Sequence, residues 1–220
     1  MGCIEYESYY LKEVEWKLLL AGIGITAWYG LDSGGTETEK MKEDVHRILA
    51  GLYQKEVIDW ENGSVVIRQP FAAMFDSLRK SRFCITIRRW KSGDPVRCCY
   101  IGETDVIVTE KSQREEEAIC LFLLAKNAFL LFALENPEVS EGIFGGSGEE
   151  EFASGEDVVS FQLRNCRSGE MKCELILQES GLQTFLVVKK EDTVWAPYRL
   201  AELKVCLRRW LYGGENDDGR

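Results

Sequence analysis

Histidine is scarce in this chain, with His46 the single histidine among 220 residues. A Ser-His-Asp triad or a Cys-His pair would therefore have to use His46. The run Asp44-Val45-His46-Arg47 places this imidazole on the exposed, charged side of a predicted helix. We expect a solvated histidine, no catalytic residues and no enzymatic activity, because most of the many carboxylates also fall in runs typical of solvated surfaces.

Cysteine pairs at metal-binding spacing are lacking, although the chain has eight cysteines. None of them forms the C-x-x-C pair that is typical of zinc sites. We expect reduced thiols that act as small buried hydrophobes, and no metal. The glycine pattern at residues 22–27 follows a predicted helix instead of a strand, so we expect no nucleotide cofactor either. The cysteines are Cys3, Cys84, Cys98, Cys99, Cys120, Cys166, Cys173 and Cys206.

No long apolar run is free of polar residues. The longest apolar segment, residues 118–134, contains Lys126-Asn127 at its centre and only just reaches the shortest membrane-spanning length of about 17 residues. A lysine at the middle of a bilayer is costly, so we expect no membrane span. Two alternatives remain, a buried helix introduced by the acidic run at residues 115–117 or a hairpin that turns at Lys126-Asn127, and we favour the helix.

The first residues lack two targeting signals. The start MGCIEYESYYLKEVEWK has no basic region followed by an apolar core, as a signal peptide would. The Met-Gly opening has Tyr6 where a myristoylation motif requires Ser or Thr. We therefore expect a cytoplasmic protein.

Basic residues are outnumbered by acidic ones, 27 to 37, which gives a net charge of -10. Such a surface repels polyphosphate, so nucleic-acid binding would require a local exception. Residues 68–91 are that exception, with seven basic residues and one acidic residue. The candidate site for an acidic partner, for the acidic loop of the chain itself or for phosphate is a basic strip that comprises Arg79, Lys80, Arg82, Arg88, Arg89, Trp90 and Lys91.

A stretch in the middle of the chain occurs twice, because residues 83–111 can be laid over residues 159–190. In both copies apolar residues alternate with other residues, which is the period of a half-buried strand. The repeat predicts two three-stranded antiparallel meanders, each followed by a helix. The aligned groups are Phe83, Ile85 and Ile87 with Val159, Phe161 and Leu163; Lys91-Ser92-Gly93 with Arg167-Ser168-Gly169; Arg97-Cys98 with Lys172-Cys173; and Val106-Ile107-Val108 with Phe185-Leu186-Val187.

The segment before the repeat predicts helices at residues 9–21 and 36–52, a hairpin at residues 57–67 and a helix that opens at Pro70. Asn62-Gly63 is a strong signal for the hairpin turn. This order is close to that of a winged helix, whose wing would be the hairpin.

The fold class is α+β, and the units follow from these patterns. Residues 1–82 form a helical, winged-helix-like unit and residues 83–134 form the first meander with its helix. Residues 135–157 form a loop with eight acidic residues, no basic residue and five glycines. Residues 158–212 form the second meander and a helix that begins at Pro197. The alternative is that all of these units form one compact domain.

The layout resembles the EspG-like chaperones of type VII secretion, whose fold also pairs two similar sheet-and-helix halves. The resemblance covers most of the chain as architecture and depends on the repeated segments RWKSGDPVRCCYIGETDVIV and RNCRSGEMKCELILQESGLQTFLVV. It implies a non-enzymatic cytosolic protein that shields the apolar tip of a helical secretion substrate. It includes no motif that assigns binding residues.

A second function remains open at this point. Residues 36–82 together with the basic strip also fit a winged-helix regulator that binds DNA. Against this, the predicted helices show few Asn, Gln or Arg residues at positions that would read base edges.

Overall fold

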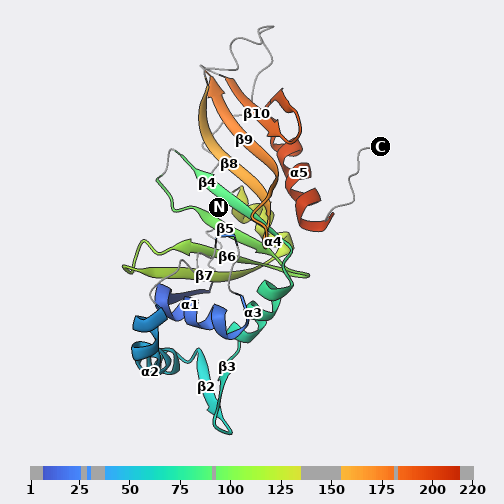
Figure 1. Cartoon of the computed structure of the whole chain (residues 1–220). Coiled ribbons are helices and arrows are strands. Elements are labelled where there is room, and N and C mark those ends of the chain that lie inside the picture. Colours follow the sequence, from blue (N-terminus) through green and yellow to red (C-terminus); the bar gives the residue numbers. More distant parts are fainter. Residues whose placement is uncertain are drawn as a thin grey trace.

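The computed structural model describes residues 7–25, 29–30, 38–90, 93–134, 155–180 and 183–213. These residues form an α+β protein with five helices, a nine-stranded antiparallel sheet and a two-stranded hairpin (Figure 1). The large sheet contains β1 (Ser8–Lys12), β4 (Phe83–Arg89), β5 (Arg97–Ile101), β6 (Asp105–Lys111), β7 (Ala118–Ala125), β8 (Glu156–Asn165), β9 (Met171–Ser180), β10 (Gln183–Lys189) and β11 (Thr193–Pro197). The hairpin is β2 (Ile58–Glu61) and β3 (Ser64–Ile67), and the helices are α1 (Glu13–Gly22), α2 (Thr38–Gln54), α3 (Phe71–Lys80), α4 (Lys126–Ala133) and α5 (Leu200–Tyr212).

The strand order in the large sheet is β1-β7-β6-β5-β4-β8-β9-β10-β11. Both predicted meanders therefore belong to one continuous sheet, and they meet where β4 pairs with β8. Each half has four strands, one more than predicted, since β7 and β11 extend the meanders. The N-terminal strand β1 pairs with β7, which joins residues 8–12 to the sheet.

The prediction of a helix over residues 118–134 is wrong for its first half. Residues 118–125 form β7, and the helix α4 begins only at Lys126. β7 lies between β1 and β6 in the sheet. Its adjacent side chains Leu121 and Phe122 are buried in cores on opposite faces of the sheet. A strand that is buried on both faces reads as a continuous apolar run, so it lacks the alternation that distinguishes strands from helices.

Two further boundaries differ from the predictions. The first four residues of the helix predicted at residues 9–21 belong to β1, because they pair with β7 instead of making helical hydrogen bonds, and α1 begins at Glu13. Pro197 is the last residue of β11, and α5 begins at Leu200. The hairpin is confirmed, with Asn62 and Gly63 at φ angles of 52° and 79° in its turn.

Pairing between β4 and β8 is symmetric about one residue pair. Ile85 lies opposite Leu163, Thr86 opposite Gln162, and Ile87 opposite Phe161. The sequence alignment matches Ile85 with Phe161 and Ile87 with Leu163, so the register has a local twofold axis between Thr86 and Gln162.

Two backbone hydrogen bonds outside the ladder obey the same symmetry. The Trp90 N–H donates to the Val158 carbonyl over 2.9 Å, and the Cys166 N–H donates to the Arg82 carbonyl over 2.9 Å. Rotation about the local twofold axis exchanges these two bonds.

Farther from the axis, the predicted alignment is wrong by one residue. Ile85 pairs with Cys99 and its counterpart Phe161 pairs with Leu175, so Cys99 corresponds to Leu175. By the same reasoning Val108 corresponds to Val188, the residue after the predicted match. A shift of one residue moves a side chain to the opposite face of a sheet. The strand pairing, and not similarity of residue type, therefore decides which residues of the two halves correspond.

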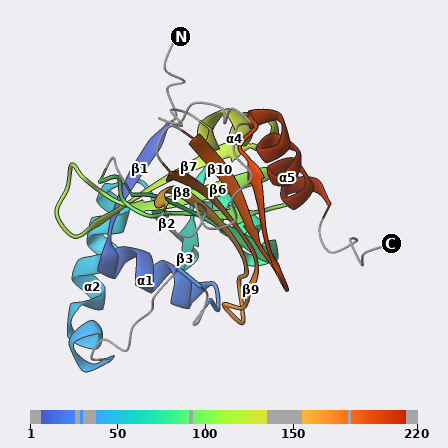
Figure 2. The ribbon, with the colours of Figure 1, turned by 90° about the horizontal axis from the view of Figure 1, so that it is seen from above.

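Helices cover the two faces of the sheet differently. On one face, α4 and α5 pack over both halves and form a core that includes Ile87, Phe122, Phe161 and Leu186. On the other face, α1, α2 and α3 form a second core with Cys84, Tyr100, Ile107 and Leu121 of the first half and Cys166 of the second. Figure 2 shows α4 and α5 on the side of the sheet opposite to α1 and α2.

Candidate partner-binding surface

Metal-binding side chains do not gather in the described part of the chain. No three His, Cys, Asp or Glu side chains there are placed to hold a metal ion. His46 is exposed on α2, as predicted, beside an ion pair between Arg47 and Asp44 over 3.0 Å. This imidazole is exposed to solvent.

The described cysteines are free thiols, and four of them, Cys84, Cys99, Cys120 and Cys166, are buried as predicted. Burial raises the pKa of Cys166 to about 12 and raises those of Cys84 and Cys99 well above their ordinary value. The Cys98 thiol is different, because hydrogen bonding with Cys84 lowers its pKa. Buried thiols with raised pKa values are poor nucleophiles.

The Cys98 thiol lies directly beneath the short segment Tyr29-Gly30. The Tyr100 hydroxyl donates to the Tyr29 carbonyl over 2.9 Å. Gly30 has a φ angle of 76°, and a Cβ atom at this position would lie 2.6 Å from the Cys98 sulfur. These contacts make the thiol cluster, which comprises Cys84, Cys98 and Cys166, a packing site that holds residues 29 and 30 on the sheet.

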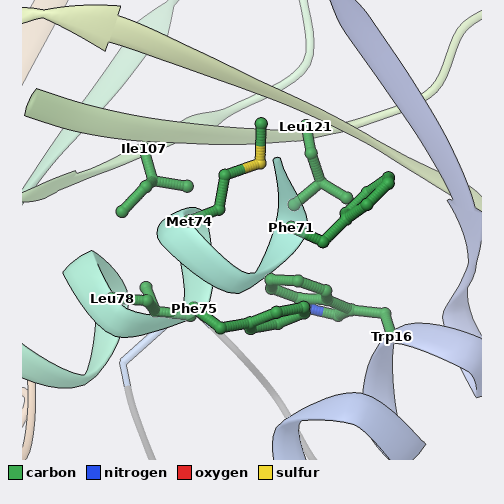
Figure 3. Close-up of a pocket in the computed structure, with 7 residues that line it drawn as sticks. All are labelled: Trp16, Phe71, Met74, Phe75, Leu78, Ile107 and Leu121. Atoms are coloured by element: carbon green, nitrogen blue, oxygen red, sulfur yellow. The ribbon is translucent and has the colours of Figure 1, made fainter. Parts of the chain in front are cut away.

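A small gap of about 10 Å³ lies between α1, α3 and the sheet (Figure 3). This volume is comparable to that of one water molecule. The buried indole N–H of Trp16 has no hydrogen-bond partner. The gap is a packing defect of the core and too small for a substrate. Its lining residues are Trp16, Phe71, Met74, Phe75, Leu78, Ile107 and Leu121.

The structure describes six of the seven residues of the predicted basic strip, and they lie on α3, on β4 and just after each of these elements. Arg79 and Lys80 lie in the last turn of α3, Arg82 follows it, and Arg88 lies near the far end of β4, which is on the order of 20 Å long. Lys91 lies outside the described residues.

Neighbouring arginines of the strip point to opposite faces of the sheet, because side chains alternate along a strand. The Arg89 side chain is mostly buried and forms an ion pair with Asp94 over 3.6 Å. The Arg88 guanidinium lies 4.8 Å from the centre of the Trp90 ring, which is 50% exposed. Among the described residues of the strip, Arg88 and Trp90 lie in contact.

The hairpin β2–β3 carries an apolar side that the sequence analysis did not single out. Ile58 lies opposite Ile67, and Trp60 lies opposite Val65, so these four side chains share one side of the hairpin. Ile58 is fully buried in the core, whereas Trp60 is 53% exposed and Val65 is 40% exposed. The apolar side therefore begins in the core and continues toward the tip. Figure 1 shows that the hairpin projects from the rest of the molecule.

The base of this hairpin is tightly fixed. The Arg68 N–H donates to the Val57 carbonyl over 2.9 Å, and the Arg68 guanidinium donates to the Asp59 carboxylate. Hydrogen bonding by Arg68 lowers the pKa of Asp59. Because Arg68 compensates the charge of Asp59, the net negative charge near the hairpin comes from the carboxylates of Glu56 and Glu61.

A second polar contact fixes the helix that leads into the hairpin. The buried Glu15 carboxylate accepts from the Lys55 ammonium over 2.7 Å and from the Lys12 N–H over 2.7 Å. The contact joins the first turn of α1 to Lys55, the residue that directly follows α2. Trp60 and Val65 therefore project from a hairpin whose base is held in place by these contacts.

Comparison with known proteins identifies no relative: no family model matches the chain, and no curated protein is detectably similar to it. None of the described helices is long and apolar enough to span a lipid bilayer. The function is therefore argued from the surfaces of this molecule.

Proposed function

We propose that the protein is a non-enzymatic, cytoplasmic binding protein that holds another protein on the hairpin β2–β3. The observation that carries the proposal is the exposure of Trp60 and Val65 on a side of the hairpin that is continuous with buried Ile58. Tryptophan is among the residues that contribute most to binding between proteins. A hairpin that is already fixed at its base loses less conformational entropy when a partner binds.

The surroundings of Trp60 indicate the chemistry of the partner. Residues 58–67 contain no basic residue, and Glu56 and Glu61 lie near Trp60 in the sequence, which favours an apolar segment with basic residues beside it. The chaperone role that the EspG-like resemblance implies fits this surface, because a projecting apolar ridge can cover the apolar end of a helical secretion substrate.

The proposal also treats the two halves of the sheet as copies of one meander-plus-helix unit, with residues 1–82 as the winged-helix-like addition that carries the hairpin. The symmetric register about Thr86 and Gln162 supports this duplication. The hairpin tip, Glu61-Asn62-Gly63-Ser64, has no basic residue, which favours protein over DNA as the partner of this wing.

The test compares two tryptophans of nearly equal exposure, Trp60 and Trp90. Tagged wild-type protein, Trp60→Ala and Trp90→Ala are used to pull down partners from native lysate with nuclease present, and bound proteins are identified by mass spectrometry. We expect one stoichiometric protein with the wild type and with Trp90→Ala, and its loss with Trp60→Ala.

Three results would overturn the proposal. Retention by Trp60→Ala would exclude the hairpin, and loss with Trp90→Ala alone would move the site to Arg88 and Trp90. Recovery of nucleic acid when nuclease is omitted, with no bound protein, would favour the DNA-binding regulator.

A further inference from the structure

The outer surface of α4 and α5 carries exposed apolar side chains. The two helices lie on the side of the sheet opposite to α1 and α2 (Figure 2). The two helices are fixed to each other, because the Lys126 ammonium at the start of α4 donates to the Leu211 carbonyl at the end of α5 over 2.9 Å. The same ammonium lies 5.5 Å from the centre of the Tyr212 ring. These contacts join the start of α4 to the end of α5.

The two helices present matching side chains to solvent. When their N-caps, Ala125 and Arg199, are superimposed, buried Phe129 corresponds to buried Leu203. In the same alignment Leu131 corresponds to Val205, and these residues are 62% and 53% exposed. Each half of the molecule therefore directs one apolar side chain outward from the same position of its helix.

A third exposed residue extends this surface along α5. Tyr212 is 61% exposed and lies seven residues after Val205. Seven residues are about two helical turns, or roughly 10.5 Å. This is the spacing at which one amphipathic helix engages another through its i and i+7 anchors.

The charge of α5 is opposite to that of the whole chain. The helix and its N-cap carry four basic residues, Arg199, Lys204, Arg208 and Arg209, and one acidic residue, Glu202, whereas the chain has a net charge of -10. Arg208 and Arg209 are exposed on either side of the line from Val205 to Tyr212. Apolar side chains bordered by cations are complementary to an acidic amphipathic helix.

We infer that the outer surface of α4 and α5 binds an acidic amphipathic helix of a partner protein. Leu131, Val205 and Tyr212 contact the apolar stripe of that helix, and Arg208 pairs with its carboxylates. The site is separate from the hairpin β2–β3, so either site can fail without the other.

The test uses two fluorescent model peptides of about 18 residues that share a leucine stripe, since this length forms about five helical turns. One peptide has glutamate at its polar positions and the other has lysine. Anisotropy is measured at low and moderate salt with wild-type protein, Val205→Ser, Arg208→Glu and Val194→Ser. Val194 is the matched control, because it is 57% exposed on the edge strand β11.

We expect the acidic peptide to bind wild type and Val194→Ser equally, and the lysine peptide not to bind. Val205→Ser and Arg208→Glu should each weaken binding about tenfold, which corresponds to 1.4 kcal/mol. Added salt should weaken wild-type binding.

Equal binding of both peptides, no binding of the acidic peptide, or wild-type affinity in Val205→Ser would overturn the inference. Analytical ultracentrifugation of the same variants addresses a second copy as the occupant. A wild-type oligomer that Val205→Ser dissociates would show that this surface joins copies of the chain and would replace the proposed partner.

Discussion

Corresponding residues in the two halves of the sheet are similar in character on one face of the sheet and differ on the other. On the face covered by α4 and α5, the corresponding residues are apolar in both halves, such as Ile85 and Phe161 or Cys99 and Leu175. On the opposite face, Cys84 corresponds to Ser160 and Tyr100 corresponds to Ile176. Apolar character is therefore shared where α4 and α5 cover the sheet, and the residues differ more on the face where α1 and α3 contact strands of the first half.

One pair of corresponding residues is chemically identical on the divergent face. Arg88 and Arg164 occupy equivalent positions about the local twofold axis. Arg164 donates to Gln162 and to the Gly169 carbonyl and lies 4.7 Å from the centre of the Tyr29 ring, whereas Arg88 lies over exposed Trp90. The same residue thus has a structural role in one half and remains accessible in the other.

The largest effect should come from cavities at corresponding core positions. Phe161→Ala should reduce the free energy of unfolding by about 3–5 kcal/mol and Ile85→Ala by about 2–5 kcal/mol, because both side chains are fully buried. Urea denaturation followed by circular dichroism should show one transition in each variant, since both halves share one sheet. A second transition in either variant would show that the halves unfold independently.

The next effect is a loss of stability at alkaline pH that originates in the thiol cluster. Burial raises the pKa of Cys166 from 9.0 to about 12 in the folded protein, so between these values the unfolded state loses a proton that the folded state keeps. Stability therefore falls as pH rises through this window, by about 1.4 kcal/mol per pH unit for each such thiol. Urea midpoints measured from pH 8 upward should fall less steeply in Cys166→Ala, and an unchanged slope would contradict this assignment.

The residues on the local twofold axis should respond differently to loss of their polar groups. Gln162 donates to Glu174 over 2.6 Å and accepts from Arg164, so Gln162→Leu should cost about 1–3 kcal/mol. The Thr86 hydroxyl lies beside Cys98, where it helps to lower the pKa of that thiol, but it makes no hydrogen bond of ordinary geometry. Thr86→Val should leave thermal stability unchanged or raise it by about 1 kcal/mol, and a clear loss would reveal a bond to the hydroxyl.

Substitution of two corresponding glycines should have equal effects in the two halves. Gly93 and Gly169 lie in corresponding turns with φ angles of 68° and 70°. Alanine at either position should cost about 1–2 kcal/mol, because a Cβ atom is unfavourable in the left-handed region. Gly22→Ala, at the end of α1 with no positive φ angle, is the control and should not destabilise. Unequal costs at the two turns, measured by thermal denaturation, would show that the turns are not equivalent.

Local signals in the sequence were sufficient for much of the fold. The Asn62-Gly63 turn and the alternation from Phe83 to Ile87 correctly predicted a hairpin and a strand, because both signals depend on neighbouring residues alone. Residues 118–125 were misassigned, since burial on both faces removes alternation. The one-residue slip between Val108 and Val187 has a related cause, because similar apolar residues on both faces fit either register.

The binding surface was harder to predict than the fold. The basic strip looked continuous in sequence, but adjacent residues such as Arg88 and Arg89 point to opposite faces of a strand. The exposure of Trp60 depends on how far the hairpin projects beyond α2, which is a property of the assembled molecule. A tryptophan near a tight turn was the only local signal of this surface.

The pairing of β1 with β7 sets an order for folding during synthesis. Leu11 lies opposite Ile119, so the N-terminal strand has no partner in this sheet until more than one hundred further residues have been made. Long-range pairing of this kind slows folding and exposes an unpaired strand in the meantime. Once β7 has left the ribosome, the first half and its N-terminal helices can close as a unit, and β4 is then the edge on which the second half is built.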